Sequence, residues 1–126
     1  MNRNELIDLA RRFVEAFNRK DLEAVMAFFD DDGVYDEFNG RRNVGKAAIR
    51  AAFEPQFTGA FGVMRFLDED LFADAEVGKV MTSWRCTLAI KGEPTSWCGL
   101  DLLHFAGGKL IAKLTYAKTK VPLLQD

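Results

Sequence analysis

The stretch from Leu100 to Leu114, LDLLHFAGGKLIAKL, decides how the C-terminal half of this chain folds. It has the two-residue alternation of β-structure on both sides of Gly107-Gly108, and such a glycine pair between two alternating runs is a turn signal for a β-hairpin. The same period extends over neighbouring segments on both sides. We therefore predict four long antiparallel strands, over residues 63–72, 77–90, 95–105 and 110–118.

The N-terminal part has helical spacing instead. Apolar residues recur at intervals of three and four positions, which predicts helices over residues 4–18, 22–29 and 44–53. Asn4 and Asp21 are the expected N-caps of the first two, and we expect the third to end before Pro55.

Between the second and third helices, residues 34–38 read as a short strand that ends at the turn Asn39-Gly40. We interpret the acidic run Asp30–Asp32 before it as a solvated turn. Helices followed by an antiparallel meander indicate an α+β fold, in which the helices cover one face of a curved sheet.

The composition limits the class of protein. The 126 residues carry a net charge of −2 and are 48% apolar, which fits one domain over residues 1–126 with its own core. The longest apolar run is Val25–Phe29, and basic residues do not cluster, so we expect neither a membrane nor a nucleic-acid partner. The charged N-terminus and the two cysteines suggest a reduced, cytoplasmic protein. A single histidine excludes a metal site that needs two imidazoles, and we expect no cofactor.

The turns set the expected register of the strands. With Gly92-Glu93 and Gly107-Gly108 as two-residue loops, Asp101 lies opposite Trp84 and opposite Leu114. One face of the sheet then surrounds Asp101 with apolar side chains, namely Trp84, Leu88, Trp97, Leu103, Phe105, Leu110, Leu114 and Tyr116. The opposite face carries a mixture that suits a homodimer interface, namely Arg85, Thr87, Cys98, Leu100, Leu102, His104, Ile111 and Lys113.

Asp101 is the most informative residue in this pattern. An ionised carboxylate without a partner is costly to bury, so the group should be protonated, hydrogen-bonded or next to water in a cavity. It is either a structural residue, bonded to the backbone or to Tyr116, or a pocket acid that serves acid–base chemistry. Asp36 and Glu37 point to opposite faces of their strand, and the pattern leaves open which of them faces inward or whether both lie at the rim.

Four segments resemble the SnoaL-like and ketosteroid isomerase-like proteins of the NTF2-like superfamily. They are FVEAFNRKDL at 13–22, FFDDD at 28–32, GKAAIR at 45–50 and the hairpin LDLLHFAGGKLI at 100–111. The resemblance covers nearly the whole chain. It implies a cone, in which a strongly bent antiparallel sheet wraps around an apolar pocket that the N-terminal helices close. It also implies dimers formed through the outer face of the sheet.

The resemblance also implies roles for three positions. Ketosteroid isomerase-like sites combine a carboxylate base with an oxyanion hole made of a tyrosine and a protonated aspartic acid. The base position falls on Glu37 and the protonated acid on Asp101, but Phe13 stands where the tyrosine would. Loss of one donor from an oxyanion hole typically costs about 10²–10³ in rate. Tyr116, Tyr35 or Trp84 could supply the missing donor.

We therefore expect a small cofactor-free enzyme, an isomerase, cyclase or dehydratase, that transfers protons on a hydrophobic carbonyl compound. Glu37 would take the proton, and Asp101, held neutral by its apolar neighbours, would bind the developing oxyanion. The expected ligand contacts are Phe13, Tyr35, Trp84, Trp97, Leu103, Leu114 and Tyr116.

Two other functions remain open. The same cone could bind a small apolar ligand, or act as a dimeric interaction domain, without catalysis. Epoxide hydrolysis would need an Asp–Arg–Asp arrangement in the pocket, and we expect Arg85 to face away from it.

Overall fold

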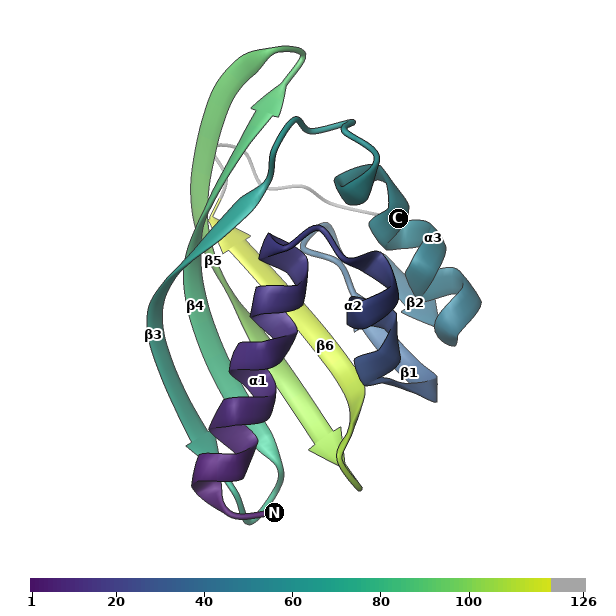
Figure 1. The fold of residues 1–126 in the computed structure, drawn as a ribbon, viewed down its shortest axis with the longest axis vertical. Coiled ribbons are helices and arrows are strands. Elements are labelled where there is room, and N and C mark those ends of the chain that lie inside the picture. The colour runs from purple at the N-terminus through teal and green to yellow at the C-terminus, as the bar shows by residue number, and fades with distance from the viewer. Residues whose placement is uncertain (119–126) are drawn as a thin grey trace.

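The computed structural model describes residues 1–118. Three helices and a six-stranded sheet follow one another along the chain (Figure 1). The helices are α1 (Arg3–Asn18), α2 (Leu22–Phe28) and α3 (Lys46–Phe57). The strands are β1 (Phe29–Asp36), β2 (Arg42–Val44), β3 (Arg65–Asp74), β4 (Lys79–Ile90), β5 (Glu93–Ala106) and β6 (Lys109–Lys118). This confirms the α+β class.

The helix ends follow local chemistry, with two departures from prediction. Asp21 caps α2 by accepting a hydrogen bond from the Ala24 amide, as expected, but Asn2 rather than Asn4 caps α1. Helix α3 runs past Pro55, whereas the sequence predicts an end before it. Packing holds this last turn in place, because the Phe57 ring lies 5.6 Å from the Phe17 ring.

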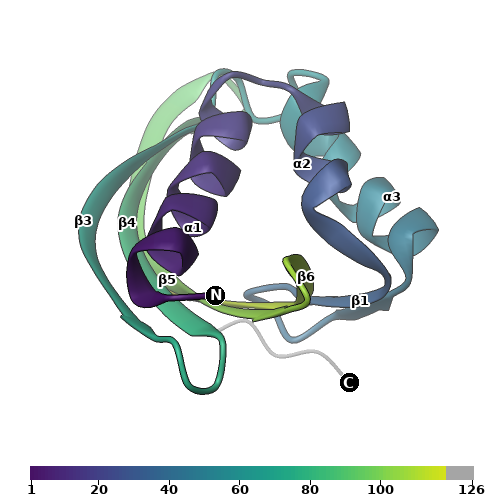
Figure 2. The same ribbon diagram turned by 60° about the horizontal axis from the view of Figure 1, so that its bottom comes forward.

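The sheet has the order β2-β1-β6-β5-β4-β3 and bends strongly (Figure 2). The β3–β4–β5–β6 part is the predicted antiparallel meander. Strand β1 adds to it by parallel pairing with β6, which joins the N-terminal third of the chain to its last described strand. The acidic run Asp30–Asp32 lies within β1 rather than in a turn, at the register shift between Phe29 and Val34, where β1 has no regular Cα partners on β6. Asp31 and Asp32 are exposed there, so the run is solvated as predicted.

The main core lies between α1, α2, α3 and the concave face of the sheet. Phe13 is its centre: it is fully buried and makes edge-to-face contacts with Phe17, Phe28 and Phe29 at 5.2–5.8 Å. Among residues 1–118, none of the helices combines the length and apolarity that crossing a membrane requires.

The β4–β5 register differs from the prediction by two residues. The turn is formed by Lys91 and Gly92, both with positive φ, so that Trp84 pairs with Gly99 and Thr82 with Asp101. A two-residue turn of this type needs positive φ at both central positions, and Lys91 adopts it. A shift of two residues keeps every side chain on its predicted face.

The β5–β6 register differs by one residue, which changes the faces. Near the turn Phe105 pairs with Leu110 as predicted, but β6 then skips Ile111, and Asp101 pairs with Thr115 instead of Leu114. This β-bulge reverses the direction of every later side chain of β6. Leu114 and Tyr116 therefore point outward, and Lys113 and Thr115 point inward, the opposite of the prediction.

Candidate functional site

A cavity of about 220 Å³ lies between the helices and the concave face of the sheet. Its wall is mostly apolar and aromatic, with a few polar groups. The lining residues are Phe13, Val14, Phe17, Tyr35, Glu37, Phe38, Ala52, Pro55, Gln56, Phe61, Met64, Phe66, Trp84, Cys86, Leu88, Trp97, Asp101, Lys113, Thr115 and Ala117. A concave apolar site with few convergent polar groups is the usual form of a small-molecule site, and this one is smaller than most.

Asp101 lies at the polar end of this cavity and is only 6% exposed. Its Oδ1 accepts hydrogen bonds from Lys113 Nζ at 3.0 Å and Thr115 Oγ1 at 2.6 Å, and its Oδ2 accepts one from Trp84 Nε1 at 3.0 Å. Three donors, one of them an ammonium, are the surroundings of a charged carboxylate. The sequence pattern predicts that Lys113 points outward, so it places no cation beside Asp101; in the structure the two side chains form a buried ion pair. The purely apolar surroundings from which a neutral Asp101 is expected are therefore not the surroundings that the structure shows.

Trp84 reaches Asp101 because Gly99 has no side chain. Gly99 is the β5 neighbour of Trp84, and a Cβ built there would lie 2.4 Å from the indole ring. The indole therefore crosses β5 at this point and directs its N–H toward Asp101. This N–H is occupied, so Trp84 cannot be the missing oxyanion donor.

Tyr35 is the buried hydroxyl of the cavity. Its ring stacks on Phe53 at 4.5 Å, and only 4% of the residue is exposed. Burial raises the pKa of Tyr35 far above its ordinary value, and the charges of Asp101 and Glu37 raise it further, while hydrogen bonding with Gln56 and Thr115 opposes the shift. The hydroxyl therefore keeps its proton and remains a donor at any ordinary pH.

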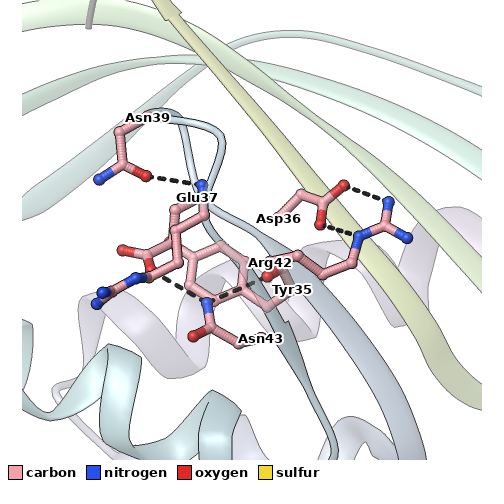
Figure 3. Close-up of polar contacts among 7 residues, drawn as sticks. Tyr35, Asp36, Glu37, Asn39, Arg42 and Asn43 are labelled. Carbon is pink, nitrogen blue, oxygen red and sulfur yellow. Dashed lines mark hydrogen bonds and ion pairs between the residues drawn. The ribbon is translucent and has the colours of Figure 1, made fainter. Parts of the chain in front are cut away.

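Glu37, and not Asp36, lines the cavity. The two side chains point to opposite sides of the chain (Figure 3). Asp36 points the other way and forms a two-pronged ion pair with Arg42, with both contacts at 2.8 Å. Glu37 lies just after β1, and its Oε2 accepts a hydrogen bond from Asn43 Nδ2 at 3.0 Å. Asn43 also donates to the Tyr35 carbonyl, so strand β2 fixes the orientation of the Glu37 carboxylate.

The expected ligand contacts divide into three groups. Phe13, Tyr35, Trp84 and Trp97 line the cavity. Leu103 is buried in the main core and is not part of the lining. Leu114 and Tyr116 are wrongly placed by the prediction, because the bulge at Ile111 turns them to the outer face, where Tyr116 is 56% exposed. Tyr116 is thereby excluded as the missing donor.

Sequence reasoning missed Lys113, Thr115 and Gln56 as members of the site. Lys113 and Thr115 were not predicted to face the cavity, because nothing in the sequence KLIAKLTYAK itself marks the position of a β-bulge. Gln56 escaped because helix α3 extends beyond its predicted end.

The remaining chemical groups take no direct part in this arrangement. Cys86 lines the cavity, but burial raises the pKa of its thiol to about 11, which keeps it protonated. Cys86 and Cys98 are both free thiols. Arg85 is exposed on the other face of the sheet. Residues 1–118 contain no group of three or more acidic, His or Cys side chains arranged to hold a metal ion.

The comparisons with known proteins agree with this architecture. The model of the SnoaL-like domain matches residues 10–113. The chain therefore belongs to the SnoaL-like domain family. No curated protein sequence matches it closely enough to be counted as a relative.

Solved structures show the same fold. A provisionally assigned polyketide cyclase from Xanthomonas campestris pv. campestris has a TM-score of 0.82 at 23% identity, with 94% of this chain and 93% of that chain covered. An NTF2-like protein of unknown function from Mesorhizobium loti has a TM-score of 0.78 at 20% identity, with 92% and 93% covered. An LEH-like epoxide hydrolase from M. tuberculosis has a TM-score of 0.78 at 20% identity, with 92% and 84% covered. At such identities they establish the fold and not the reaction.

Proposed function

We propose that this protein is a small enzyme that transfers a proton on an apolar carbonyl compound held in the cavity. The observation that carries the proposal is the Glu37 carboxylate, which lines an otherwise apolar cavity and is held in place through one oxygen only. Among the hydrogen bonds of residues 1–118, Oε2 accepts from Asn43 and Oε1 accepts none. Oε1 is thus available to take a proton from a bound molecule.

In the proposed reaction, Glu37 removes a proton from the carbon next to the carbonyl, and negative charge develops on the carbonyl oxygen. The hydroxyl of Tyr35, which burial keeps protonated, is a suitable donor to that oxygen. It supplies the hydrogen bond that Phe13 cannot. Glu37 then returns the proton to another carbon, which completes an isomerisation, or the enolate goes on to ring closure or loss of water.

Asp101 has a supporting role in this proposal. Its oxygens are occupied by Lys113, Thr115 and Trp84, so it holds the polar end of the cavity together and does not donate to the substrate.

Proton exchange tests the proposal without knowledge of the natural substrate. A panel of cyclic enones and ketones is incubated with the protein in deuterated buffer, and incorporation at the α-carbon is followed by NMR. We expect exchange with the wild-type protein and a loss of at least about 100-fold in the Glu37→Gln variant, within the range of a general base.

Asp36→Asn is the matched control, because Asp36 is the adjacent carboxylate and points away from the cavity. It should keep the exchange rate. A wild-type protein that binds ketones but exchanges no proton would refute catalysis and leave a ligand-binding domain, the function that Phe13 at the tyrosine position favours.

Epoxide hydrolysis, the activity in the name of the M. tuberculosis neighbour, has little support here. The lining of the cavity contains no arginine among the described residues, and its single cation is Lys113.

A further inference from the structure

Lys113 is a buried positive charge that faces the cavity and has no role in the reaction described so far. The residue is only 6% exposed, and among the lining residues described it is the single basic side chain. A lysine is rarely buried to this extent without a specific partner, because desolvation of the ammonium is costly. The three N–H groups of its ammonium should therefore each have an acceptor.

Two N–H groups of Lys113 have protein acceptors. Nζ donates to Asp101 Oδ1 at 3.0 Å and to Thr115 Oγ1 at 2.7 Å. Within residues 1–118, no further acceptor takes the third N–H. Because Lys113 lines the cavity, this third N–H is within reach of a bound molecule.

Aromatic rings form the rest of the surroundings. Nζ lies 4.6 Å from the centre of the Tyr35 ring and 5.7 and 5.8 Å from those of Phe17 and Phe53. These rings stabilise a cation and keep water away from it. In such a dry place, a charge acts more strongly on a nearby oxygen than it would in water.

We propose that Lys113 is the oxyanion subsite of the cavity. Its third N–H, together with the Tyr35 hydroxyl, binds the oxygen of an enolisable ketone or a phenol while that oxygen carries negative charge. This inference rests on the proposed function and deepens it by naming the charged group and the ligand class. Asp101 and Thr115 are positioning residues, which hold the ammonium in place.

The proton balance of the step is simple. Glu37 takes the α-proton, and the electron pair of the broken C–H bond moves to form a carbon–carbon double bond and an oxygen anion. Lys113 and Tyr35 keep their protons and donate hydrogen bonds to that oxygen. The return of the proton from Glu37 to carbon restores all groups, and nothing is oxidised or reduced.

Substituted 2-naphthols test the subsite, because a bound naphtholate has the planar shape and delocalised oxygen charge of an enolate. The ionised and neutral forms differ in their absorption spectra, so the pH at which the bound naphthol ionises in its ground state can be read from absorbance. The titratable groups that face the site are Tyr35 from β1, Glu37 after it, Cys86 from β4 and Asp101 from β5. Naphthalene is the apolar reference ligand.

We expect the wild-type protein to bind naphthol more tightly than naphthalene and to ionise it at a lower pH than in solution. Lys113→Arg should keep this preference. Because removal of one member of a buried ion pair can prevent folding, the uncharged test protein is the double variant Lys113→Met with Asp101→Asn. It should lose the preference for the ionised form by about tenfold or more, because the ammonium that would contact the bound oxygen is gone, whereas the Asp101 carboxylate, which is removed with it, does not contact that oxygen in this proposal.

The Glu37→Gln variant separates this inference from the proposed function. It should lose proton exchange and still ionise naphthol at a lower pH than in solution, because it removes a negative charge from the cavity and keeps the Lys113 ammonium. Equal naphthol ionisation in the wild type and in the folded double variant, or naphthol binding no tighter than naphthalene, would overturn the role of Lys113. Persistent proton exchange in Glu37→Gln would overturn the proposed base and leave the Lys113 result standing.

Discussion

Some residues of the site can be predicted from the sequence pattern, and others cannot. Asp101 among tryptophans and leucines, and an acid at 36 or 37, stand out in the pattern, and both expectations lead into the same cavity. The ion-pair partner of Asp101 could not be predicted, because Lys113 reaches it only where one unpaired residue of β6 turns the lysine inward. The chemistry of this cavity thus depends on a backbone irregularity as much as on residue types.

Thr82 has a buried hydroxyl group that forms no hydrogen bond with any of the described residues. It is 2% exposed and pairs with Asp101 across the β4–β5 ladder. A buried polar group without a hydrogen bond costs about 1–3 kcal/mol. We expect Thr82→Val, which replaces the hydroxyl by a methyl of the same shape, to raise the free energy of unfolding by about 1 kcal/mol in urea denaturation.

Thr87→Val on the same strand is the control for this substitution. Thr87 is only partly buried, so the change should leave stability nearly unaltered. A Thr82→Val variant that is less stable than the wild type would mean that the hydroxyl has a partner, such as a bound water.

Among the elements, the three helices and the four long strands follow from periodicity, since each needs only its own sequence. The pairing of β1 with β6 does not, because it joins residues about eighty positions apart and has no turn to mark it. The bulge in β6 could not be predicted for a related reason. Ile111 has no partner on β5, and this becomes visible only when the pairing of the two strands is known.

The bulge gives a test at the level of the element. Because Ile111 is the extra residue, its deletion would leave Lys113 on the same face as Asp101, with a regular ladder. Deletion of Leu114 instead would turn Thr115 and Ala117 outward. We expect the Ile111 deletion to remain folded and to bind naphthol, and the Leu114 deletion to be the less stable of the two in thermal denaturation. The opposite order would show that the bulge itself is needed.

At the scale of the whole molecule, the sequence predicts a bent sheet with the helices against its concave face, and the structure has this arrangement. The outer face of the sheet is the surface through which we propose that two copies associate. Phe72, Met81, Leu102 and Leu114 lie in one row across four strands, and Leu100 and Tyr116 lie beside them. Phe72 and Tyr116 are more than half exposed, and contiguous apolar surface of this kind is typical of an interface.

Light scattering checks this expectation. We expect a dimer at micromolar concentration and a shift to monomer in Leu102→Glu, because a carboxylate in the middle of the row would have to be buried without a partner. Val63→Glu is the control, since Val63 is 73% exposed in the segment before β3. A wild-type monomer, or a Leu102→Glu dimer of unchanged stability, would remove the outer face as the interface.

The parallel pairing of β1 with β6 has a consequence for synthesis of the chain on the ribosome. Helices α1, α2 and α3 emerge first, and their apolar faces have no complete wall to rest on until β6 has left the exit tunnel and closed the sheet against β1. Contacts between such distant segments form slowly. During that interval the nascent chain exposes its phenylalanine-rich interior, so we infer that its dependence on chaperones ends with the emergence of β6.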